Sequence, residues 1–501
     1  MIAAAYLLMA PPSADLAAAL YRSELLARHG FTLWDGQWYA GHHTPAYSVL
    51  FPPLAWLVGV RVLAALSVIA AAGLFAVLLD RHVGSPSALG PVWFGGGVAV
   101  DLLTGRVAFL LGVALGLAAL LRAGRARSWS AGALALLSAL ASPVAGAFVV
   151  LAGAVGVMTG PRRAVAGALV AGALTPIALL ELAFPEGGRE PFAASSFWPA
   201  LVTLLVMAAA IPATHRRLRV GTVLYALVCV VAFVGHSPAG GNVVRLVALT
   251  AGPVAAATLI PARPRLLVAL ALPLAYLQLQ APVRDLLVSA ADPSVSAAYY
   301  RPVLAYLNGR PGPPFRVEVP FTRSHWEAYR LAPRLPLARG WERQLDIARN
   351  PLFYRRHLAV SDYRSWLDAN AVAYVALPDV ALDASARAEA SLLLRGTPDL
   401  RPVWSSAHWR VYAVAHPAPV VQGPATLRRL GVDGFTLAVG VAAPIRVSER
   451  FTPYWAVVGG RGCVQAAPGG FTTVRPAAPG ELRVAIRFAP GRVLDHGPRC
   501  G

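Results

Sequence analysis

The sequence predicts a polytopic α-helical membrane domain followed by a polar tail with an α/β part and a β-rich part. The 501 residues are 57% hydrophobic and only 14% charged, whereas ordinary soluble domains carry about 25% charged residues. The apolar runs lie before Gln280, and the later sequence mixes charge, proline-rich loops and short strands. We therefore expect a membrane domain over 1–283, an extracytoplasmic α/β domain over 284–418 and an extracytoplasmic β-sandwich-like domain over 419–501.

About eleven apolar segments are expected to be transmembrane. They cover residues 1–10, 54–79, 88–103, 107–121, 129–140, 144–159, 164–184, 197–214, 220–235, 243–261 and 266–281. Several are shorter than the roughly 20 residues that a straight span needs, so tilted or partly re-entrant segments are expected among them. The first segment, MIAAAYLLMA, fits either a short signal peptide or a first helix shortened by a misplaced start codon.

The loops between these segments alternate in charge. The basic set contains Arg81-His82, Arg122/Arg125/Arg127, Arg162-Arg163, His215-Arg216-Arg217/Arg219 and Arg263/Arg265. The mixed or acidic set contains residues 11–53, 101–106, 142–143, 184–197 and 236–242. Short arginine-rich loops stay in the cytoplasm, so the second set should face outward, and eleven spans place the tail outside. The net charge of +20 then reflects topogenic arginine, and no nucleic-acid partner is expected.

The tail carries periodic patterns of both kinds. Strands are predicted at 315–319, 371–378 and 409–414, and helices at 361–370 and 382–396, with Ser361 and Asp383 as caps. Five β-like runs after residue 419 suit a β-sandwich. Cys463 and Cys500 can form a disulfide if the tail lies in an oxidising space, with free thiols as the alternative, whereas Cys229 reads as a small buried hydrophobe.

The large first outward loop, residues 11–53, is unusually rich in polar and aromatic side chains. Asp15 can act in chemistry or cap a helix over 16–29, for which Ser13 is an alternative cap. Asp35 can bind substrate or serve as a turn carboxylate. His42 and His43 can bond a sugar or phosphate, bind a metal, or be ordinary interface histidines. The rings of residues 34–39 can stack on a sugar, although an aromatic belt at the lipid head groups is the better interpretation.

The loop pattern resembles a known superfamily. It begins with an acidic residue and an amphipathic helix after the first apolar segment, and it ends in W-x(3)-W-Y-x-G-H…F-P-P-L. This resembles the GT-C-type membrane glycosyltransferases, and more closely the bacterial YfhO-like and "6-pyruvoyl-tetrahydropterin-synthase-related" membrane proteins. The segment PFRVEVPFTRSHWEAYRLAPRLPLARGWERQLD is similar to the post-membrane segment of uncharacterised actinobacterial relatives.

The resemblance implies transfer of a sugar from a polyprenyl-phosphate donor to a glycan or protein acceptor of the envelope, with inversion, outside the cytoplasmic membrane. It places the catalytic base just after the first helix, where Asp15 stands, and a second acidic site on the next outward loop, where Asp101 stands. No cofactor is firmly implied, although a divalent metal is possible. The expected location is the inner (cytoplasmic) membrane, multi-pass, within the lipid bilayer.

Three further residues are candidates for substrate binding. Arg106 follows Asp101 by five residues, and a simple interfacial Asp–Arg pair is the competing interpretation. Arg245 can hold a lipid phosphate by bidentate hydrogen bonds, or it can snorkel to the interface. Glu181 lies inside an apolar run, where a charge usually faces a cavity or a partner.

Two other functions compete with sugar transfer. A transporter would show repeated halves, but the sequence has no internal repeat, an odd span count and a long tail. A non-catalytic envelope scaffold with the same fold is the third possibility.

Overall fold

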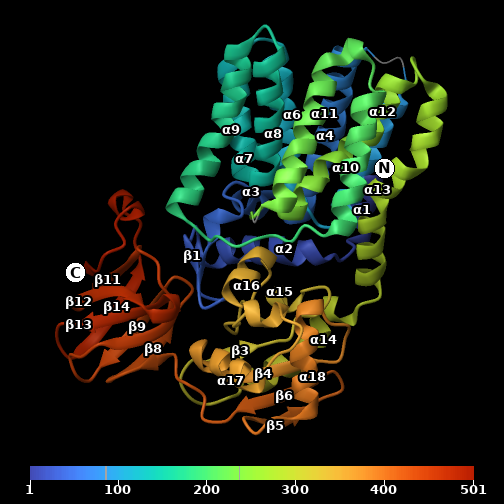
Figure 1. The fold of residues 1–501 in the computed structure, drawn as a ribbon. Coiled ribbons are helices and arrows are strands. Elements are labelled where there is room, and N and C mark those ends of the chain that lie inside the picture. Colours follow the sequence, from blue (N-terminus) through green and yellow to red (C-terminus); the bar gives the residue numbers. More distant parts are fainter. Residues whose placement is uncertain (85–86, 236) are drawn as a thin grey trace. The chain divides into compact units, whose positions relative to one another are not determined.

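The computed structural model describes residues 1–84, 87–235 and 237–501 (Figure 1). His236, which heads one predicted outward loop, lies outside the described residues. The chain divides into two compact units. A helical unit contains residues 1–24 and 45–291, and a tail unit contains residues 25–44 and 292–501. The middle of the first outward loop, residues 25–44, therefore belongs with the tail, which the sequence did not suggest.

Each of the eleven predicted apolar segments contains an α-helix, and the segment 54–79 is broken at Gly59 into two helices. The helical unit contains α1 (Ile2–Met9), the start of α2 (Ala14–His29), α3 (Phe51–Val58), α4 (Val60–Val83), α5 (Leu89–Leu103), α6 (Val107–Gly124), α7 (Ser128–Ala141), α8 (Pro143–Thr159), α9 (Arg163–Ala183), α10 (Ala194–Ala210), α11 (Arg216–Val234), α12 (Val244–Leu259) and α13 (Pro264–Ala290).

Six helices within the described residues are long and apolar enough to cross a membrane. They are α4, α6, α9, α13, α11 with its preceding 3-10 turn, and α12 with its preceding 3-10 turn. The pair α1 and α2 passes the same test together but is bent by 71° at its break, and α5, α7, α8 and α10 are shorter apolar helices. A membrane-spanning region is thus supported, while crossing by all eleven segments stays a prediction.

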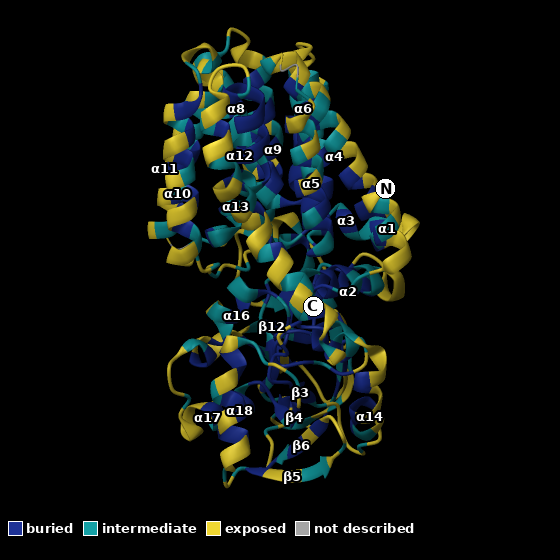
Figure 2. Cartoon of the chain, turned by 90° about the vertical axis from the view of Figure 1, so that its right-hand side faces the viewer, coloured by how far each residue is buried: buried dark blue, intermediate teal, exposed yellow. Residues whose placement is uncertain are grey.

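Small residues let these helices approach closely. A Cβ on Gly112 of α6 would lie 2.6 Å from the Cβ of Ala145, and a Cβ on Gly172 of α9 would lie 2.2 Å from the carbonyl oxygen of Gly132. Such contacts are typical of helices that associate in lipid. There the hydrophobic effect is absent, and close packing of the backbones drives association instead. Much of α11 is exposed (Figure 2), and its exposed residues include the apolar Val223, Leu227 and Val231.

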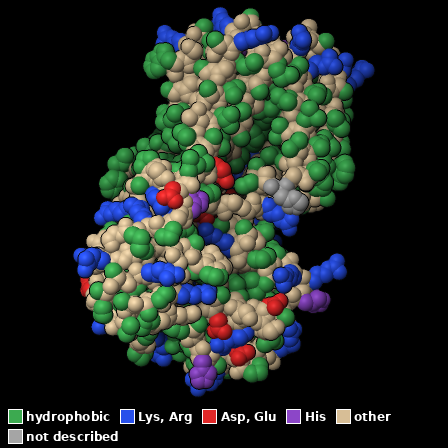
Figure 3. All heavy atoms as spheres, turned by 60° about the vertical axis from the view of Figure 1, so that its left-hand side comes forward, with side chains coloured by type: hydrophobic (Ala, Val, Ile, Leu, Met, Phe, Trp, Pro, Cys, Tyr) green, Lys and Arg blue, Asp and Glu red, His purple; other side chains and the backbone are tan. Residues whose placement is uncertain are grey.

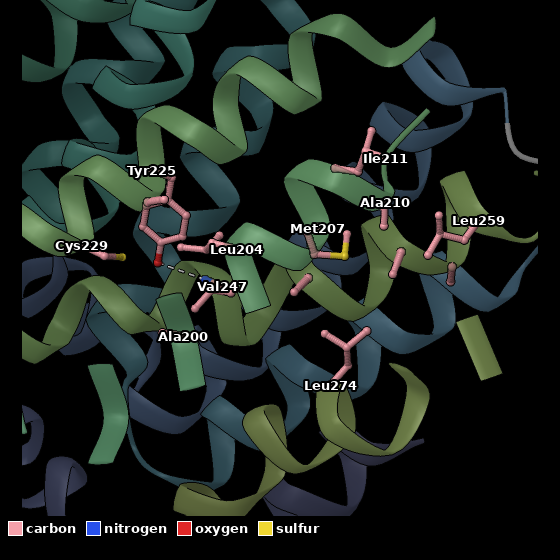
Figure 4. Packing of buried hydrophobic residues seen from close by; sticks show 14 of the residues in the cluster. Ala200, Leu204, Met207, Ala210, Ile211, Tyr225, Cys229, Val247, Leu259 and Leu274 are labelled. Atoms are coloured by element: carbon pink, nitrogen blue, oxygen red, sulfur yellow. Dashed lines mark hydrogen bonds between the residues drawn. The ribbon is translucent and has the colours of Figure 1, made fainter. Parts of the chain in front are cut away.

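A buried cluster packs α10, α11, α12 and α13 together (Figure 4). Its polar member is Tyr225, whose hydroxyl donates to the carbonyl of Val243 and accepts from the backbone N–H of Val247 at 3.1 Å. Cys229 is a buried free thiol in the same cluster, in agreement with its predicted role. The phenol therefore ties the start of α12 to the middle of α11 without leaving a polar group unmatched.

The basic loops gather at one end of the helical unit (Figure 3). Arg162 Nη1 donates to the carbonyl of Gly124 at 3.0 Å, which joins two of these loops. His82, Arg162 and Arg217 line one cavity at that end. Loops of the mixed set meet one another as well, because the N–H of Glu190 donates to the carbonyl of Ser237 at 3.0 Å. The helices therefore run alternately between a basic end and a mixed end.

The α/β part of the tail contains one mixed sheet. Its strands are β3 (Arg316–Glu318), β4 (Val372–Pro378), β6 (Trp409–Val414) and β5 (Leu400–Ser405), in that order, with β3 and β4 parallel. The helices are α14 (Ala297–Asn308), α15 (Glu327–Arg330), α16 (Arg343–Arg349), α17 (Val360–Ala369) and α18 (Arg387–Arg395). The predicted strands and helices are confirmed.

The two predicted caps have different outcomes. Asp383 accepts from the backbone N–H of Ser385 at 2.9 Å and caps the short helical turn before α18. The prediction of Ser361 as a cap was wrong, because α17 begins at Val360, and Ala359, two residues before Ser361, holds the cap position. Val360 has helical geometry, so the hydroxyl of Ser361 is already inside the first turn.

The β-rich part consists of two antiparallel sheets. One has the order β15-β12-β13-β10-β7 and the other β11-β14-β9-β8. Their bounds are β7 (Val421–Gln422), β8 (Ala425–Leu430), β9 (Gly434–Val439), β10 (Ile445–Arg450), β11 (Trp455–Gly459), β12 (Gly462–Ala467), β13 (Phe471–Pro476), β14 (Gly480–Ile486) and β15 (Arg499–Cys500). Alternate residues of both sheets share one core, as in a sandwich. Cys463 and Cys500, which are paired across β12 and β15, form a disulfide.

Candidate functional site

Five charged residues meet at the mixed end of the helical unit, and we call them the acid–arginine cluster. They are Asp15, Asp101, Arg106, Arg245 and Asp285. They come from the first turn of α2, the end of α5, the residue before α6, the first turn of α12 and the last turns of α13. The cluster thus joins segments that lie up to 270 residues apart in the sequence.

Arg106 is the centre of this cluster. Its Nη1 donates to Asp101 Oδ1 at 3.0 Å, and its Nε lies 3.6 Å from Asp15 Oδ2. The Asp101 side chain is 7% exposed and that of Asp15 is 36% exposed. Asp101 therefore orients the guanidinium from the protein side, while Asp15 is the carboxylate that a substrate can reach.

A glycine makes this meeting possible. Gly105 has a φ of +82°, and a Cβ there would lie 2.4 Å from the backbone nitrogen of Leu16 and 2.5 Å from Ser13 Oγ. The turn between α5 and α6 consequently packs its bare backbone on the beginning of α2. Because α2 begins at Ala14, Asp15 lies inside the first turn, one side of which faces Arg106.

Two more charges complete the cluster. The guanidinium of Arg245 lies 5.2 Å from the ring centroid of Phe109, and it is close enough to interact electrostatically with Asp15, Asp101 and Arg106. Asp285 interacts in the same way with Arg106 and Asp15. The sequence placed Asp285 at the start of the tail. An acidic residue near the end of an apolar helix was the signal that could have identified it.

His42 lies in the tail unit and not in the cluster. The short strands β1 (Trp34–Asp35) and β2 (His42–His43) pair so that Asp35 faces His42. The ring of His42 lies between two carboxylates, with Nδ1 4.0 Å from Asp35 Oδ2 and Nε2 3.6 Å from Glu342 Oε1. It also stacks on Trp38. His42 and Asp35 are both almost fully buried, so this group holds the loop to the tail.

His43 points to a different set of partners. Its Nε2 lies 2.9 Å from Thr452 Oγ1, and its ring meets those of Trp34 and Tyr454 edge-on. Neighbouring residues in a strand point to opposite faces, which explains why the two histidines do not converge. Within the described residues, no group of three or more His, Cys, Asp or Glu side chains has a metal-binding arrangement.

The aromatic belt expected at residues 34–39 is wrong. Trp34, Trp38 and Tyr39 are at most 1% exposed. The indole N–H of Trp38 donates to the carbonyl of Ala328 at 3.1 Å, and the hydroxyl of Tyr39 bonds the backbone of Gly340. Rings buried in protein can reach neither lipid head groups nor a sugar, so they act as core residues that anchor the loop.

Glu181 is exposed on α9. Among the residues that the structure describes, Glu181 forms no hydrogen bond or ion pair with the acid–arginine cluster. Of the eight residues that the sequence suggested for catalysis or substrate binding, the structure brings together Asp15, Asp101, Arg106 and Arg245. It places Asp35, His42 and His43 in the other unit.

The tail also buries a charge network that the sequence did not indicate. Arg339 is bidentate to Asp346, at 3.1 and 2.7 Å, and lies 3.6 Å from carboxylate oxygens of both Glu318 and Glu389. Burial raises the pKa of Glu389 to about 7, although Arg339 opposes this shift. All four side chains are at most 2% exposed, so this network is a buried structural feature that is closed to solvent.

A second buried group lies beside it. His325 stacks on Trp341 at 3.7 Å, with Glu327 and Asp383 on either side at 3.6 and 3.7 Å. Burial lowers the pKa of His325 and raises that of Glu327 to about 8. The histidine is therefore neutral over most of the physiological range, and Glu327 is protonated at neutral pH.

Comparison of the chain with models of known protein families and with curated proteins finds no match. Function must therefore be inferred from the side chains of the acid–arginine cluster and their positions in the helical unit.

Proposed function

We propose that the chain is a GT-C-type membrane glycosyltransferase that moves a sugar from a polyprenyl-phosphate donor to an envelope acceptor. The observation that carries this proposal is Arg106, held between Asp15 and Asp101 at the mixed end of the helices. A general base and cations for a leaving phosphate are the two requirements of sugar transfer from a lipid phosphate.

The cluster divides these tasks by exposure. Asp15, the more exposed carboxylate, accepts the proton of the acceptor hydroxyl as the acceptor oxygen bonds to the anomeric carbon. The bond from that carbon to the phosphate oxygen breaks, and the polyprenyl phosphate leaves with the electron pair. Arg245 and Arg106 stabilise the charge on the leaving phosphate. Asp101 positions Arg106 and does not touch substrate.

The proposed topology follows from the two ends of the helical unit. Arginine-rich loops stay in the cytoplasm, so the basic end faces inward and the acid–arginine cluster faces outward. Eleven membrane crossings then put the tail unit outside as well. A protein of the inner membrane with this orientation has its cluster on the side where polyprenyl-linked sugars are used by enzymes of this class.

The test is transfer by the full-length protein in proteoliposomes. Radiolabelled polyprenyl-phosphate sugars are offered one at a time with an envelope fraction as acceptor. Labelled acceptor and released polyprenyl phosphate are both measured. We expect Asp15→Asn to lower transfer by 10²–10⁴-fold, the usual contribution of a general base. Asp80→Asn is the matched control, because Asp80 is an exposed aspartate at the end of α4.

Normal transfer by a folded Asp15→Asn protein would reject the proposal. Absence of transfer with every donor, combined with uptake of a solute that depends on Arg245, would favour the transporter instead. An Asp101→Asn variant distinguishes the positioning role of Asp101 from the role of Asp15 as the base. It should weaken donor binding by releasing Arg106, and it should leave the pH dependence of transfer unchanged.

A further inference from the structure

The helical unit contains a second feature that sugar transfer does not use. A cavity of about 940 Å³ lies among α4, α6, α8, α9, α11 and α12. It follows α6 from Phe109 to Gly124, a distance of about 22 Å at 1.5 Å per residue. Binding pockets usually have volumes of about 300–1,000 Å³, so this cavity is large enough for a sizeable ligand.

The interior of the cavity is apolar. Its lining is mostly Leu, Val, Ala, Gly and Phe. The hydroxyls of Thr159, Thr222 and Thr250 each donate to a carbonyl four residues earlier in the same helix. The Tyr225 hydroxyl is bonded to α12 and its preceding turn. These hydroxyl groups are therefore already hydrogen-bonded within the protein, so the interior of the cavity is suited to a hydrocarbon ligand.

The mouth of the cavity at the basic end has the opposite character. Arg162, Arg216 and Arg217 line it together with His82 and His215. Among the described lining residues, none is Asp or Glu. All three arginines are exposed, so their charge is available to a ligand. The helices α9 and α11 also begin here without a side-chain cap, which adds partial positive charge.

We propose that this cavity binds an anionic phospholipid of the bilayer, with its phosphate among Arg162, Arg216 and Arg217 and its acyl chains along α6. Basic pockets between membrane helices on the cytoplasmic side are known to bind anionic head groups. The hydrocarbon of one leaflet is about 15 Å deep, which the cavity length of about 22 Å accommodates. A soluble anion would use the mouth alone, and a neutral lipid would leave the three arginines unmatched.

The site is separate from the acid–arginine cluster. Its head-group residues lie at the starts of α9 and α11, which carry no residue of the cluster. The cavity approaches the cluster at Phe109, whose ring faces Arg245, and at Leu246. The inference therefore does not depend on sugar transfer. The lipid would act as a structural ligand that fills the space between α6 and α11.

The test is titration of the delipidated full-length protein, in neutral detergent at low salt, with fluorescent phosphatidylglycerol or phosphatidylcholine. The wild type should bind phosphatidylglycerol more tightly. A triple variant, Arg162→Gln with Arg216→Gln and Arg217→Gln, should lose on the order of a hundredfold in affinity for it. The matched control changes three exposed arginines of the same end outside the cavity: Arg81→Gln, Arg125→Gln and Arg265→Gln.

A second variant tests the apolar part. Gly221 lines the cavity, and a Cβ there meets Val155 at an ordinary 3.5 Å. Gly221→Leu should therefore fold, fill the cavity and reduce binding of both lipids. Gly167→Leu, where a Cβ has nothing within 4 Å, adds the same side chain elsewhere and should bind normally.

Several results would overturn the proposal. These are equal wild-type affinity for the two lipids, equal losses in the test and control triple variants, and normal lipid binding by a folded Gly221→Leu protein. Displacement of phosphatidylglycerol by inorganic phosphate alone would also overturn it, because it would indicate a small-anion site in which the hydrocarbon cavity takes no part.

Discussion

The buried ion pair between Arg316 and Glu449 should contribute strongly to the stability of the tail unit. Arg316 on β3 is fully buried and Glu449 on β10 is 2% exposed. Arg316 Nη2 donates to Glu449 Oε1, and its Nη1 donates to the carbonyl of Asn370 at 3.1 Å. Since β3 belongs to the α/β sheet and β10 to the sandwich, this pair connects the two parts of the tail.

Glu449→Ala removes the only carboxylate that pairs with Arg316 in the described structure. Burial already lowers the pKa of Arg316, and Glu449 opposes that shift. Removing one partner of a buried pair costs about 3–5 kcal/mol. For a unit of about 150–250 residues, 1 kcal/mol corresponds to about 2–4 °C, so we expect Tm to fall by about 6–20 °C.

The double variant Arg316→Met/Glu449→Leu separates pairing from packing. Replacing both charges of a buried pair by apolar groups is often neutral or stabilising, so this protein should regain most of the lost Tm. The exposed pair Arg355–Asp362, at 3.3 Å and with side chains 61% and 52% exposed, is the control. Asp362→Ala should cost less than about 1 kcal/mol.

The measurement is thermal unfolding of the full-length protein in detergent at pH 8, with hydrogen exchange of the β10 amides as a readout specific to the tail. Burial raises the pKa of Glu449 to about 7, so the carboxylate is charged at this pH. Equal Tm losses for Glu449→Ala and the double variant would refute the reasoning. A loss for Glu449→Ala no larger than that for Asp362→Ala would refute it as well.

Three further outcomes are expected. Gly41→Ala should unfold or strongly destabilise the tail in the same thermal assay, because φ is +111° and the new Cβ would lie 2.2 Å from a ring carbon of Trp34; an unchanged Tm would contradict the described packing. Burial raises the pKa of Glu327 to about 8, above its unfolded value near 4.3, so the folded state holds this proton more tightly. Its contribution to stability is full below about pH 4.3 and is lost as the pH rises through 8; Tm measured from pH 5 to 9 should fall less in Glu327→Gln. Reduction of the Cys463–Cys500 disulfide, which closes a loop of 37 residues, should cost about 4 kcal/mol, measured as the difference in Tm with and without a thiol reductant; no difference would argue against a disulfide in the native protein.

Most secondary structure could be predicted because its signals are local. Apolar runs and charged loops indicated the helices between residues 54 and 281, and alternation indicated strands such as 409–414. The prediction of the cap at Ser361 was wrong because a shift of one or two residues at a helix end costs little, and neighbouring residues offer nearly equal starts.

Only part of the candidate site could be predicted. The sequence suggested four of the five residues of the acid–arginine cluster, but it also suggested Asp35, His42, His43 and Glu181, which lie elsewhere. Asp15 was suggested by the resemblance of the first outward loop to GT-C-type proteins, and Arg245 by its ability to hold a lipid phosphate. Asp101 stood out because ionisable groups are costly near hydrocarbon. Asp285 was missed because the helix that carries it extends to Ala290, beyond the apolar run that marked the segment. The bare backbone of Gly105 against α2 decides which of these charges meet, and such a long-range approach leaves no periodic signal in the sequence.

By itself the sequence determined a membrane-type helical domain with a basic end, and a tail of α/β and β-rich parts, because these follow from hydropathy and charge along short stretches. Only the tertiary structure decided whether residues 34–43 lie at a lipid interface or in the core of the tail unit. Tryptophan and tyrosine suit both a lipid interface and a protein core, and nothing local distinguishes the two. Their partners, such as Ala328 and Gly340, lie about 300 residues later in the chain, so packing alone makes this loop part of the tail.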